Sequence, residues 1–324
     1  MLKYVTFGVK VQLNVHDLNN EAVAGNVTDI RIMDFLDENG EKREAPAVSG
    51  RMLKHWHYEA MRHLILNGGY SSLPLCNGCR MGEPIRPGDV RSETLVQIAR
   101  PEGNSVSVCT ICDIHGYLIA QGAQQEGERG ASARRTSRAM FSWLMPVLGT
   151  DFSSKQVVHT RVSQQQAMAE GEGAAQMIFN KSYASGIYAF VSALDVERIG
   201  LVELNLGTNK PYAIEDSDRK QRAKVAIEAY RYLISGQMGA SLSHAIPHTQ
   251  PIEILAAYSE TSPLPFPISP IYNDYIKEYK GLVPNNTSIL LWNQTDEKVE
   301  GVTMKSTINE VFAEILDKLA SEEK

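Results

Sequence analysis

The sequence has none of the features of membrane or secreted proteins. No apolar run approaches the roughly 18 residues of a membrane-spanning helix, and residues 1–15 alternate polar and apolar without the apolar core of a signal peptide. Only four of its 324 residues are cysteine, which argues against a scaffold held by disulfides. We therefore expect a soluble cytoplasmic protein that is long enough to bury its own core.

An excess of positive charge is also missing. Lys and Arg number 32 against 38 Asp and Glu, which gives a formal net charge of −6. This excludes a generic basic coat for nucleic acid, so any positive charge that binds nucleic acid must be local. Hydrophobic residues make up 43% and charged residues 22%, values that exclude wholesale disorder.

Motifs of nucleophilic and nucleotide chemistry are absent. The eight histidines are scattered, and no Gly-x-Ser-x-Gly segment occurs. The glycine-rich segment 235–241 follows a predicted helix and lacks the Gly-Lys-Ser/Thr of a nucleotide-binding loop. Asp29, Asp34 and Asp37 lie in a polar stretch that is typical of solvated turns. We therefore predict that the protein is not an enzyme and has no catalytic residues.

Apolar periodicity predicts the main elements. These are a strand at 4–15, a helix from Ser49 to Gly68, a strand near 114–119, a hairpin with arms 155–162 and 176–183, a strand at 186–194, a helix at 218–234, a strand at 252–258, a hairpin at 288–303 and a helix at 306–320. Without the insertions, the order from 1 to 258 is the split β-α-β-β-α-β arrangement. The predicted fold class is therefore α+β, with a ferredoxin-like core similar to an RNA-recognition motif.

The four cysteines form two pairs, Cys76-x-x-Cys79 and Cys109-x-x-Cys112. Four thiolates suit tetrahedral zinc, and the Gly- and Pro-rich segment between the pairs has little apolar core of its own. We predict a structural zinc ion. His115 can replace one cysteine as a ligand, and a redox pair or unconnected free thiols are the alternatives.

Arginine is concentrated in one segment. Arg129, Arg134, Arg135 and Arg138 lie among Gly, Ala, Ser and Thr residues. Small residues let a phosphate chain approach closely, and guanidinium groups bind its oxygen atoms. The segment therefore predicts a nucleic-acid backbone contact. The alternative is a solvated loop whose arginines pair with acids of the same chain.

A predicted helix start is a second candidate. Ser49, Gly50 and Arg51 open the helix, Lys54 and His55 follow one turn later, and a helix N-terminus attracts anions. An ordinary N-cap serine followed by glycine is the simpler interpretation.

The glycine-rich segment is the third candidate. Gly236, Met238, Gly239 and Ser241 follow the predicted helix at 218–234. The segment suits a backbone contact to a sugar-phosphate chain or a plain C-cap turn.

Four segments in a fixed order resemble a known family. They are AVSGRMLKHWH at 47–57, GASARRTSRAMFSWLMP at 130–146, FNKSYASGIYAFVSALD at 179–195 and SGQMGASLSHAIPH at 235–248. Together they are similar to the DevR-type backbone subunits of type I CRISPR effector (Cascade) complexes, within the RAMP superfamily. The similarity covers nearly the whole chain. The cysteine pairs are not shared by every branch of that family, so the metal prediction rests on their spacing.

The resemblance implies a hand-shaped protein. The palm comprises residues 1–69, 113–154 with the basic loop, and 184–324 with the C-terminal hairpin and helix. Residues 70–112 are the finger insertion that carries the metal site, and 155–183 are the thumb hairpin.

The resemblance also implies partners and a binding surface. Copies of the chain assemble head to tail along a CRISPR guide RNA together with other Cascade subunits, and the guide pairs with target DNA. The guide-contact candidates from matching segments and the thumb are Ser49, Gly50, Arg51, Lys54, His55, Arg129, Arg134, Arg135, Arg138, His159, Arg161, Lys181, Gly236, Met238, Gly239 and Ser241.

Two other functions are open to the sequence. Related backbone subunits of type III complexes cut target RNA with an aspartate in a loop near the first strand, and Asp34 is the candidate for that role in a metal-dependent endoribonuclease. The other alternative is an autoregulatory nucleic-acid-binding protein that acts outside the complex.

Overall fold

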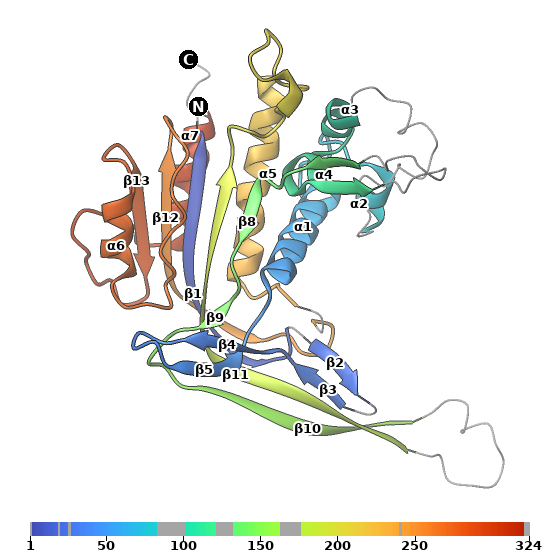
Figure 1. The fold of residues 1–324 in the computed structure, drawn as a ribbon, viewed down its shortest axis with the longest axis vertical. Coiled ribbons are helices and arrows are strands. Elements are labelled where there is room, and N and C mark those ends of the chain that lie inside the picture. Colours follow the sequence, from blue (N-terminus) through green and yellow to red (C-terminus); the bar gives the residue numbers. More distant parts are fainter. Residues whose placement is uncertain are drawn as a thin grey trace, which may run out of the picture.

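The computed structural model describes residues 2–18, 20–24, 27–82, 101–120, 132–162, 176–239 and 242–320. It is a mixed α/β fold around a large central sheet, with the main helices packed on one face (Figure 1). Strand β1 (Tyr4–His16) lies at the centre of the sheet and pairs antiparallel with β11 (Gln176–Asp195) and β12 (His248–Ser259). No described helix has the length and apolar character needed to cross a membrane.

The sheet continues outward from these three strands in the order β14-β13-β12-β1-β11-β3-β2, and β8, β9 and β10 also pair with β11. The further bounds are β2 Asn20–Ala24, β3 Val27–Ile30, β8 Ala139–Phe141, β9 Met145–Pro146, β10 Phe152–Val162, β13 Ser288–Asn293 and β14 Thr303–Met304. Because β13 and β14 pair in parallel, the predicted C-terminal hairpin at 288–303 is wrong. Two further strand pairs lie outside this sheet, β4 (Ile32–Leu36) with β5 (Lys42–Pro46) and β6 (Tyr117–Ala120) with β7 (Ser132–Arg135).

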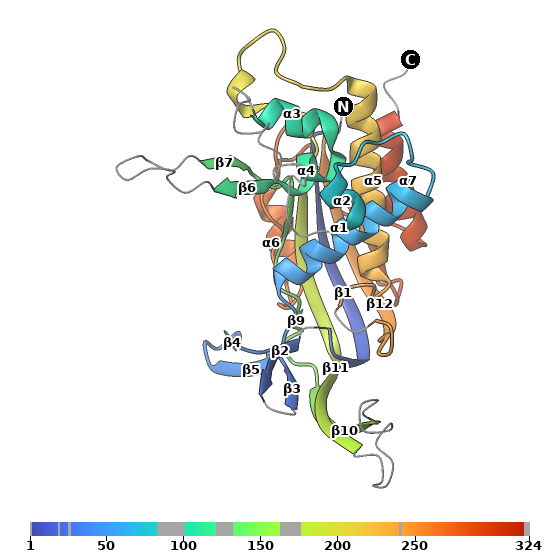
Figure 2. The same cartoon turned by 90° about the vertical axis from the view of Figure 1, so that its right-hand side faces the viewer.

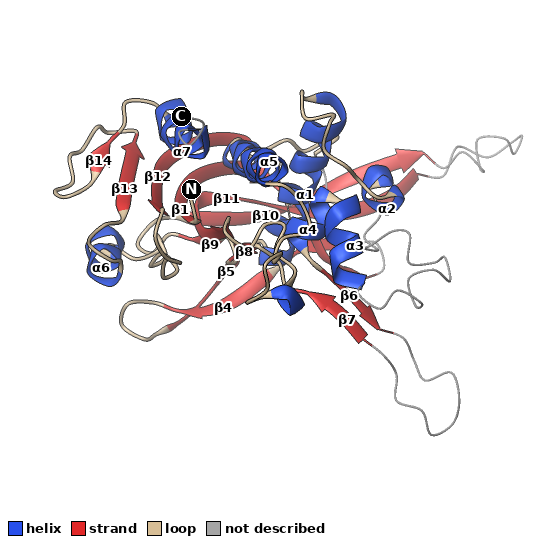
Figure 3. Ribbon diagram, turned by 90° about the horizontal axis from the view of Figure 1, so that it is seen from above, coloured by secondary structure: helices blue, strands red, loops and turns tan. Residues whose placement is uncertain are grey.

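Helices α1 (Gly50–Asn67), α5 (Asp216–Ile234) and α7 (Ile308–Ala320) agree with the predicted helices. They bury the apolar face of β1, where Phe7 lies 4.5 Å from Tyr230 and 5.8 Å from Phe312 between ring centroids. Helix α6 (Tyr275–Leu282), which was not predicted, packs on the other face (Figure 3). The remaining helices are short: α2 Asn77–Met81, α3 Pro101–Val108, α4 Thr110–His115 and the 3₁₀ helix Glu203–Asn205.

The predicted strand at 4–15 is confirmed as β1, but its last residues depart from the alternation. Val5, Phe7 and Val9 are buried, whereas Val15 is 54% exposed. The register between β1 and β11 shifts between Leu13 and His16, and Val15 has a φ of +54°. This bulge turns His16 and Asp17 into the protein interior.

The structure corrects three further sequence predictions. The polar stretch between β1 and α1 carries the short strands β2 to β5. The strand expected near 114–119 begins only at Tyr117, because residues up to His115 belong to α4. The end of the basic segment is not a loop, since residues 132–135 form β7, which pairs with β6 in a hairpin that projects from the molecule (Figure 2).

The hairpin predicted between 155 and 183 is confirmed. Strand β10 pairs antiparallel with the first half of β11, from Phe152 opposite Gly186 to Val162 opposite Gln176. Both strands run away from the helical layer (Figure 1). The predicted tip at 164–175 lies outside the described residues.

Two buried histidines make the fold sensitive to acid. Burial lowers the pKa of His16 to about 4 and that of His57 to about 4, against an ordinary value of 6.5. The unfolded chain therefore binds these protons first as the pH falls. Stability is complete above about pH 6.5 and declines towards about pH 4, by about 2 kcal/mol for each imidazole between about pH 7.5 and about pH 5.

Urea unfolding at a series of pH values measures this loss. His16→Gln keeps a polar side chain that does not titrate in this range, so it should make the acid side of the stability profile shallower. The exposed His55→Gln serves as the surface control. An acid slope as steep in His16→Gln as in the unchanged protein would contradict the assignment.

Candidate metal centre and nucleic-acid interface

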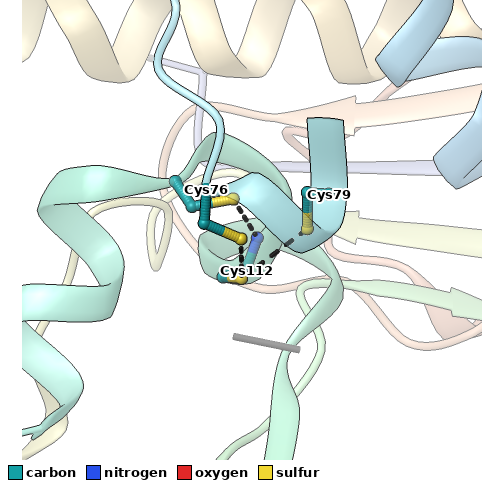
Figure 4. Close-up of side chains that lie close together, drawn as sticks. Cys76, Cys79 and Cys112 are labelled. Atoms are coloured by element: carbon teal, nitrogen blue, oxygen red, sulfur yellow. Dashed lines mark hydrogen bonds between the residues drawn. The ribbon is translucent and has the colours of Figure 1, made fainter. Parts of the chain in front are cut away.

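The four cysteines come from two short helix starts. Cys76 is the N-cap residue of α2 and Cys79 lies three residues later, while Cys109 and Cys112 repeat this arrangement at α4. A spacing of three residues places both side chains of a pair at the same end of a helix. The two helix starts face each other, and Cys76, Cys79 and Cys112 turn their sulfur atoms toward one another (Figure 4).

The sulfur geometry fits one tetrahedral metal ion. All four Sγ atoms lie within 4.8 Å of one another, and all four side chains are buried. The Sγ atom of Cys112 is 3.8 Å from those of Cys76 and Cys79. A regular tetrahedron with metal–sulfur bonds of about 2.3 Å has edges of about 3.8 Å. None of the four cysteines is in a disulfide bond.

The environment of the sulfurs is compatible with a bound cation. Hydrogen bonding to Cys109 and the other two thiols, with burial added, raises the pKa of the Cys112 thiol. If these thiols are deprotonated in the interior, their negative charges need a cation between them, and a metal ion supplies it. His115 is outside the four-residue group, and its Nε2 atom lies 3.0 Å from Nδ1 of His57. Four sulfurs complete a tetrahedral shell and leave no open position for a reactive water.

A buried ion-pair network lies directly behind the cysteines. Asp113 follows Cys112 and is completely buried, with ion pairs to Arg135 and to Arg222, the latter at 2.9 Å. Arg135 also pairs with Glu102 at 2.7 Å. The network joins α3, α4, β7 and α5 through charged groups that have little contact with solvent.

Two of the predicted RNA-binding arginines therefore have partners inside the protein. The side chain of Arg135 is 0% exposed, and so is that of Arg138, which pairs with Glu203 at 2.8 Å. Of the two interpretations of the basic segment, pairing with acids of the same chain describes these residues. Arg134 is exposed on β7. Arg129 lies outside the described residues.

The start of α1 is built around a capped serine. The Ser49 hydroxyl accepts a hydrogen bond of 3.2 Å from the Met52 amide, which is the N-cap role. Gly50 is buried, and a Cβ atom there would lie 2.7 Å from the Phe141 carbonyl oxygen. Arg51 and His55 are exposed and Lys54 is half-buried, so these three present the positive charge of this helix start.

The glycine-rich segment serves the fold. Gly236 has a φ of +86°, where a Cβ would lie 2.1 Å from Oγ1 of Thr249. At Gly239, a Cβ would meet Leu18 at 2.3 Å. Met238 is buried, and Ser241 lies outside the described residues.

Midway along the β10–β11 hairpin, opposite Val157, Lys181 is buried in an ion pair with Asp17, and its Nζ atom lies 3.1 Å from Nε2 of His244. This side chain therefore ties the hairpin to the end of β1.

The hairpin also has a mixed aromatic and basic face. His159 on β10 is half-buried and stacks on Phe179 with ring centroids 5.3 Å apart. Its Nε2 atom lies 3.2 Å from the hydroxyl of Tyr183. Lys155, four residues before His159, is an exposed basic residue on the same side of the strand, and it is not among the predicted contact residues although the period of two in a strand relates it to His159. Arg161 lies in β10, and its side chain is not described.

Asp34 does not form part of an acidic cluster. It lies exposed on β4 and pairs with Lys42 at 2.9 Å. Among the described residues, the cysteine cluster is the one group of possible metal ligands. Glu44 lies opposite Asp34 in the β4–β5 pair, and Lys42 pairs with both carboxylates, so Asp34 belongs to no described group of three or more possible metal ligands.

Comparisons with known proteins match most of this chain to CRISPR-associated proteins. The family "CRISPR-associated negative auto-regulator DevR/Csa2" matches residues 7–280. The chain is 27% identical to a protein of Methanocaldococcus jannaschii described as CRISPR-associated protein Cas7/Cst2/DevR, over 96% of this chain and 98% of that protein. It is 25% identical to the Saccharolobus solfataricus "CRISPR-associated aCascade subunit Cas7/Csa2 2", over 96% of this chain and 99% of that protein.

Solved structures share the fold. A chain of a "CRISPR RNA-guided surveillance complex, pre-nicking" superposes with a TM-score of 0.55 at 10% identity, over 98% of this chain and 99% of that chain. A chain of a second such surveillance complex gives a TM-score of 0.52 at 11% identity, over 97% of this chain and 99% of that chain.

The buried network predicts a large effect at Asp113. Asp113→Ala leaves two buried guanidinium groups without their shared partner, so it should lower the free energy of unfolding by about 3–5 kcal/mol. Asp216→Ala is the matched control, because its carboxylate is 75% exposed and pairs with Arg219 at 2.8 Å. That change should lower stability by at most about 1 kcal/mol. Urea unfolding measures both, and equal losses would show that burial does not distinguish the two carboxylates.

Proposed function

Because the chain belongs to the DevR/Csa2 family of CRISPR-associated proteins, we propose that it is a guide-RNA-binding backbone subunit of a type I CRISPR surveillance complex. Several copies assemble head to tail along the guide RNA, beside other Cascade subunits in the cytoplasm. The guide then pairs with target DNA. The protein itself holds the RNA backbone and catalyses no reaction.

One observation carries this proposal, namely similarity along the whole length to proteins described as Cas7. The relative from Saccharolobus solfataricus is described as an aCascade subunit, and the match covers 96% of this chain and 99% of that protein. The fold likeness to chains of RNA-guided surveillance complexes agrees with the same role.

The arrangement of elements supports the division into a palm, a finger and a thumb. In the strand order β12-β1-β11, with β8 on the outer side of β11 and with α1 and α5 on one face, the core corresponds to a split β-α-β-β-α-β palm. Residues 70–112 form the finger insertion, and the 155–183 hairpin forms the thumb. The palm comprises 1–69, 113–154 and 184–324.

We assign RNA binding to the basic residues that remain accessible. Arg51, Lys54 and His55 lie at the start of α1, Arg134 on β7 and His159 on β10. Accessible cations at a few places let a protein with a net charge of −6 bind a phosphate chain without repelling it overall. Buried Arg135, Arg138 and Lys181 support this surface from within.

The two alternatives are weaker. An endoribonuclease acting through Asp34 is not favoured, since this carboxylate pairs with Lys42. The family description includes negative autoregulation, so DNA binding is the second candidate. Specific binding to the protein's own promoter DNA without guide RNA would support it.

We propose that the metal at the cysteine cluster is zinc. Zinc prefers four tetrahedral thiolates, and Cys76, Cys79, Cys109 and Cys112 supply them at the sulfur spacing that zinc requires. The ion is structural: it joins α2 to α4 and thereby closes the finger insertion.

The RNA surface predicts a double variant with weakened binding. Arg51→Ala with Arg134→Ala should weaken binding to single-stranded RNAs of unrelated sequence by the same factor, because phosphates are the main contact. If each arginine neutralises one phosphate, the slope of log affinity against log salt should fall by about 1.4. Lys277→Ala with Lys298→Ala removes the same charge from exposed positions in α6 and between β13 and β14, and serves as the control.

Fluorescence anisotropy at several salt concentrations measures this effect, and sedimentation with guides of increasing length measures assembly. Particle mass should grow in steps with RNA length, because a head-to-tail interface does not close. A closed dimer that ignores RNA length would contradict the proposed role, and unchanged affinity in the arginine double variant would remove both residues from the surface.

The metal assignment predicts about one zinc per chain by elemental analysis. Cys112→Ser should lower the zinc content, while His115→Gln should keep it, because the imidazole is not a ligand. Chelation should increase hydrogen exchange in residues 70–82 and 101–115 before it affects β1. Ordered disulfides between these cysteines, or full zinc content in Cys76→Ser with Cys109→Ser, would contradict the assignment.

A further inference from the structure

Trp143 is an exposed aromatic side chain on a rigid segment. Its neighbour Ser142 donates its amide to the Val191 carbonyl at 2.9 Å, and the Ser142 hydroxyl accepts from the Val191 amide at 2.9 Å. On the other side, Leu144 and Val48 exchange two backbone hydrogen bonds of 2.9 and 3.0 Å. The backbone is therefore fixed on both sides of Trp143, yet its side chain remains 36% exposed.

A guanidinium group lies against the indole. The Cζ atom of Arg31 lies 5.6 Å from the centroid of the Trp143 ring, within the range of a cation–π contact. The Arg31 carbonyl accepts the Ala47 amide at 3.0 Å, so this residue is attached to the same strand segment that pairs with Leu144. The contact holds the indole in place and adds positive charge beside it.

The indole lies next to the start of α1. The antiparallel pairing of Val48 with Leu144, continued by one residue, places Ser49 opposite Trp143. Gly50 packs on the backbone of Phe141 and Ser142, and the exposed Arg51 follows it. The acids nearest along the β4–β5 hairpin, Asp34 and Glu44, both lie close to Lys42. The aromatic face thus lies against the half-buried Arg31, and the exposed Arg51 follows the backbone that packs beside Trp143.

We propose that Trp143 is a stacking platform for an unpaired nucleobase, with the adjoining phosphate held by Arg51. Every base has a π face, so the contact is independent of sequence. A preordered indole loses little entropy on stacking, and the cation beside it favours the phosphate of the same nucleotide. This inference rests on the proposed RNA-binding function and adds to it a site that reads the presence of a base.

Matched oligonucleotides separate base stacking from phosphate binding. Two single-stranded RNAs of equal length are compared, one intact and one with abasic ribose throughout, so that the phosphate number is the same. Trp143→Ala should bind the intact RNA about tenfold more weakly and bind the abasic RNA as the unchanged protein does. Trp143→Phe keeps a ring and should retain most of the affinity for intact RNA.

Tryptophan fluorescence reports the contact directly. Intact RNA should quench the emission of the unchanged protein, abasic RNA should not, and Trp143→Phe should lose the RNA-dependent change although Trp56 and Trp292 remain. Tyr272→Ala removes another aromatic side chain, 40% exposed, between β12 and α6, and should leave both affinities unchanged. Circular dichroism melting checks that each variant is folded.

Three outcomes would contradict base stacking on Trp143 without contradicting the proposed RNA-binding function. Equal weakening of intact and abasic RNA in Trp143→Ala would assign the residue to the backbone contact or to the fold. If the Trp143 variants keep the affinity for intact RNA and the RNA-dependent fluorescence change, the base binds elsewhere. Normal binding of single copies combined with lost assembly would make Trp143 part of a protein interface. Absence of RNA binding by the unchanged protein would refute the proposed function itself.

Discussion

The buried carboxylate of Asp113 is the contact on which the arrangement of the insertion depends. It lies one residue after a cysteine of the metal cluster, and it pairs with Arg135 of β7 and Arg222 of α5. The Gly200 amide also donates to it, at 3.0 Å. A buried carboxylate is stable only while its ion-pair partners and hydrogen-bond donors stay in contact with it, so few positions of these groups are tolerated. Asp113 thus determines where α4, β7 and α5 lie relative to one another.

This constraint connects the cysteine cluster to the exposed residue Arg134 on β7. The cysteines determine the start of α4, α4 carries Asp113, and Asp113 holds β7 through Arg135. The neighbouring residue on β7 is Arg134, whose side chain points to solvent. Along a strand, neighbouring side chains point to opposite sides, so a buried Arg135 directs Arg134 outward. The cysteine cluster therefore helps to orient a side chain that we propose to bind RNA.

Sequence patterns predicted the regular parts of this fold well. The alternation in β1 and in the two arms of the β10–β11 hairpin is a periodic signal over many residues, and a capping serine and a terminal glycine mark the ends of α1. The short strands β2 to β5 carry no such signal. Likewise, the cysteine spacing predicted the cluster because two short helix starts determine the ligand positions locally. The prediction of a C-terminal hairpin was wrong, because the relative direction of β13 and β14 depends on the path of the chain between them. Local composition does not specify that path.

Burial was the property that the sequence did not reveal at charged positions. Arg134, Arg135 and Arg138 belong to one basic segment, yet the side chains of the last two are buried. They form ion pairs there with Asp113 and Glu203, which are distant in sequence. The opposite holds at Trp143, where an apolar segment leaves its largest side chain partly in solvent. A basic run in the sequence therefore does not show which of its side chains are accessible, and an apolar run can leave a side chain in solvent. Under the proposed function, the contacts with RNA depend on the few side chains that the fold leaves accessible more than on the net charge of −6.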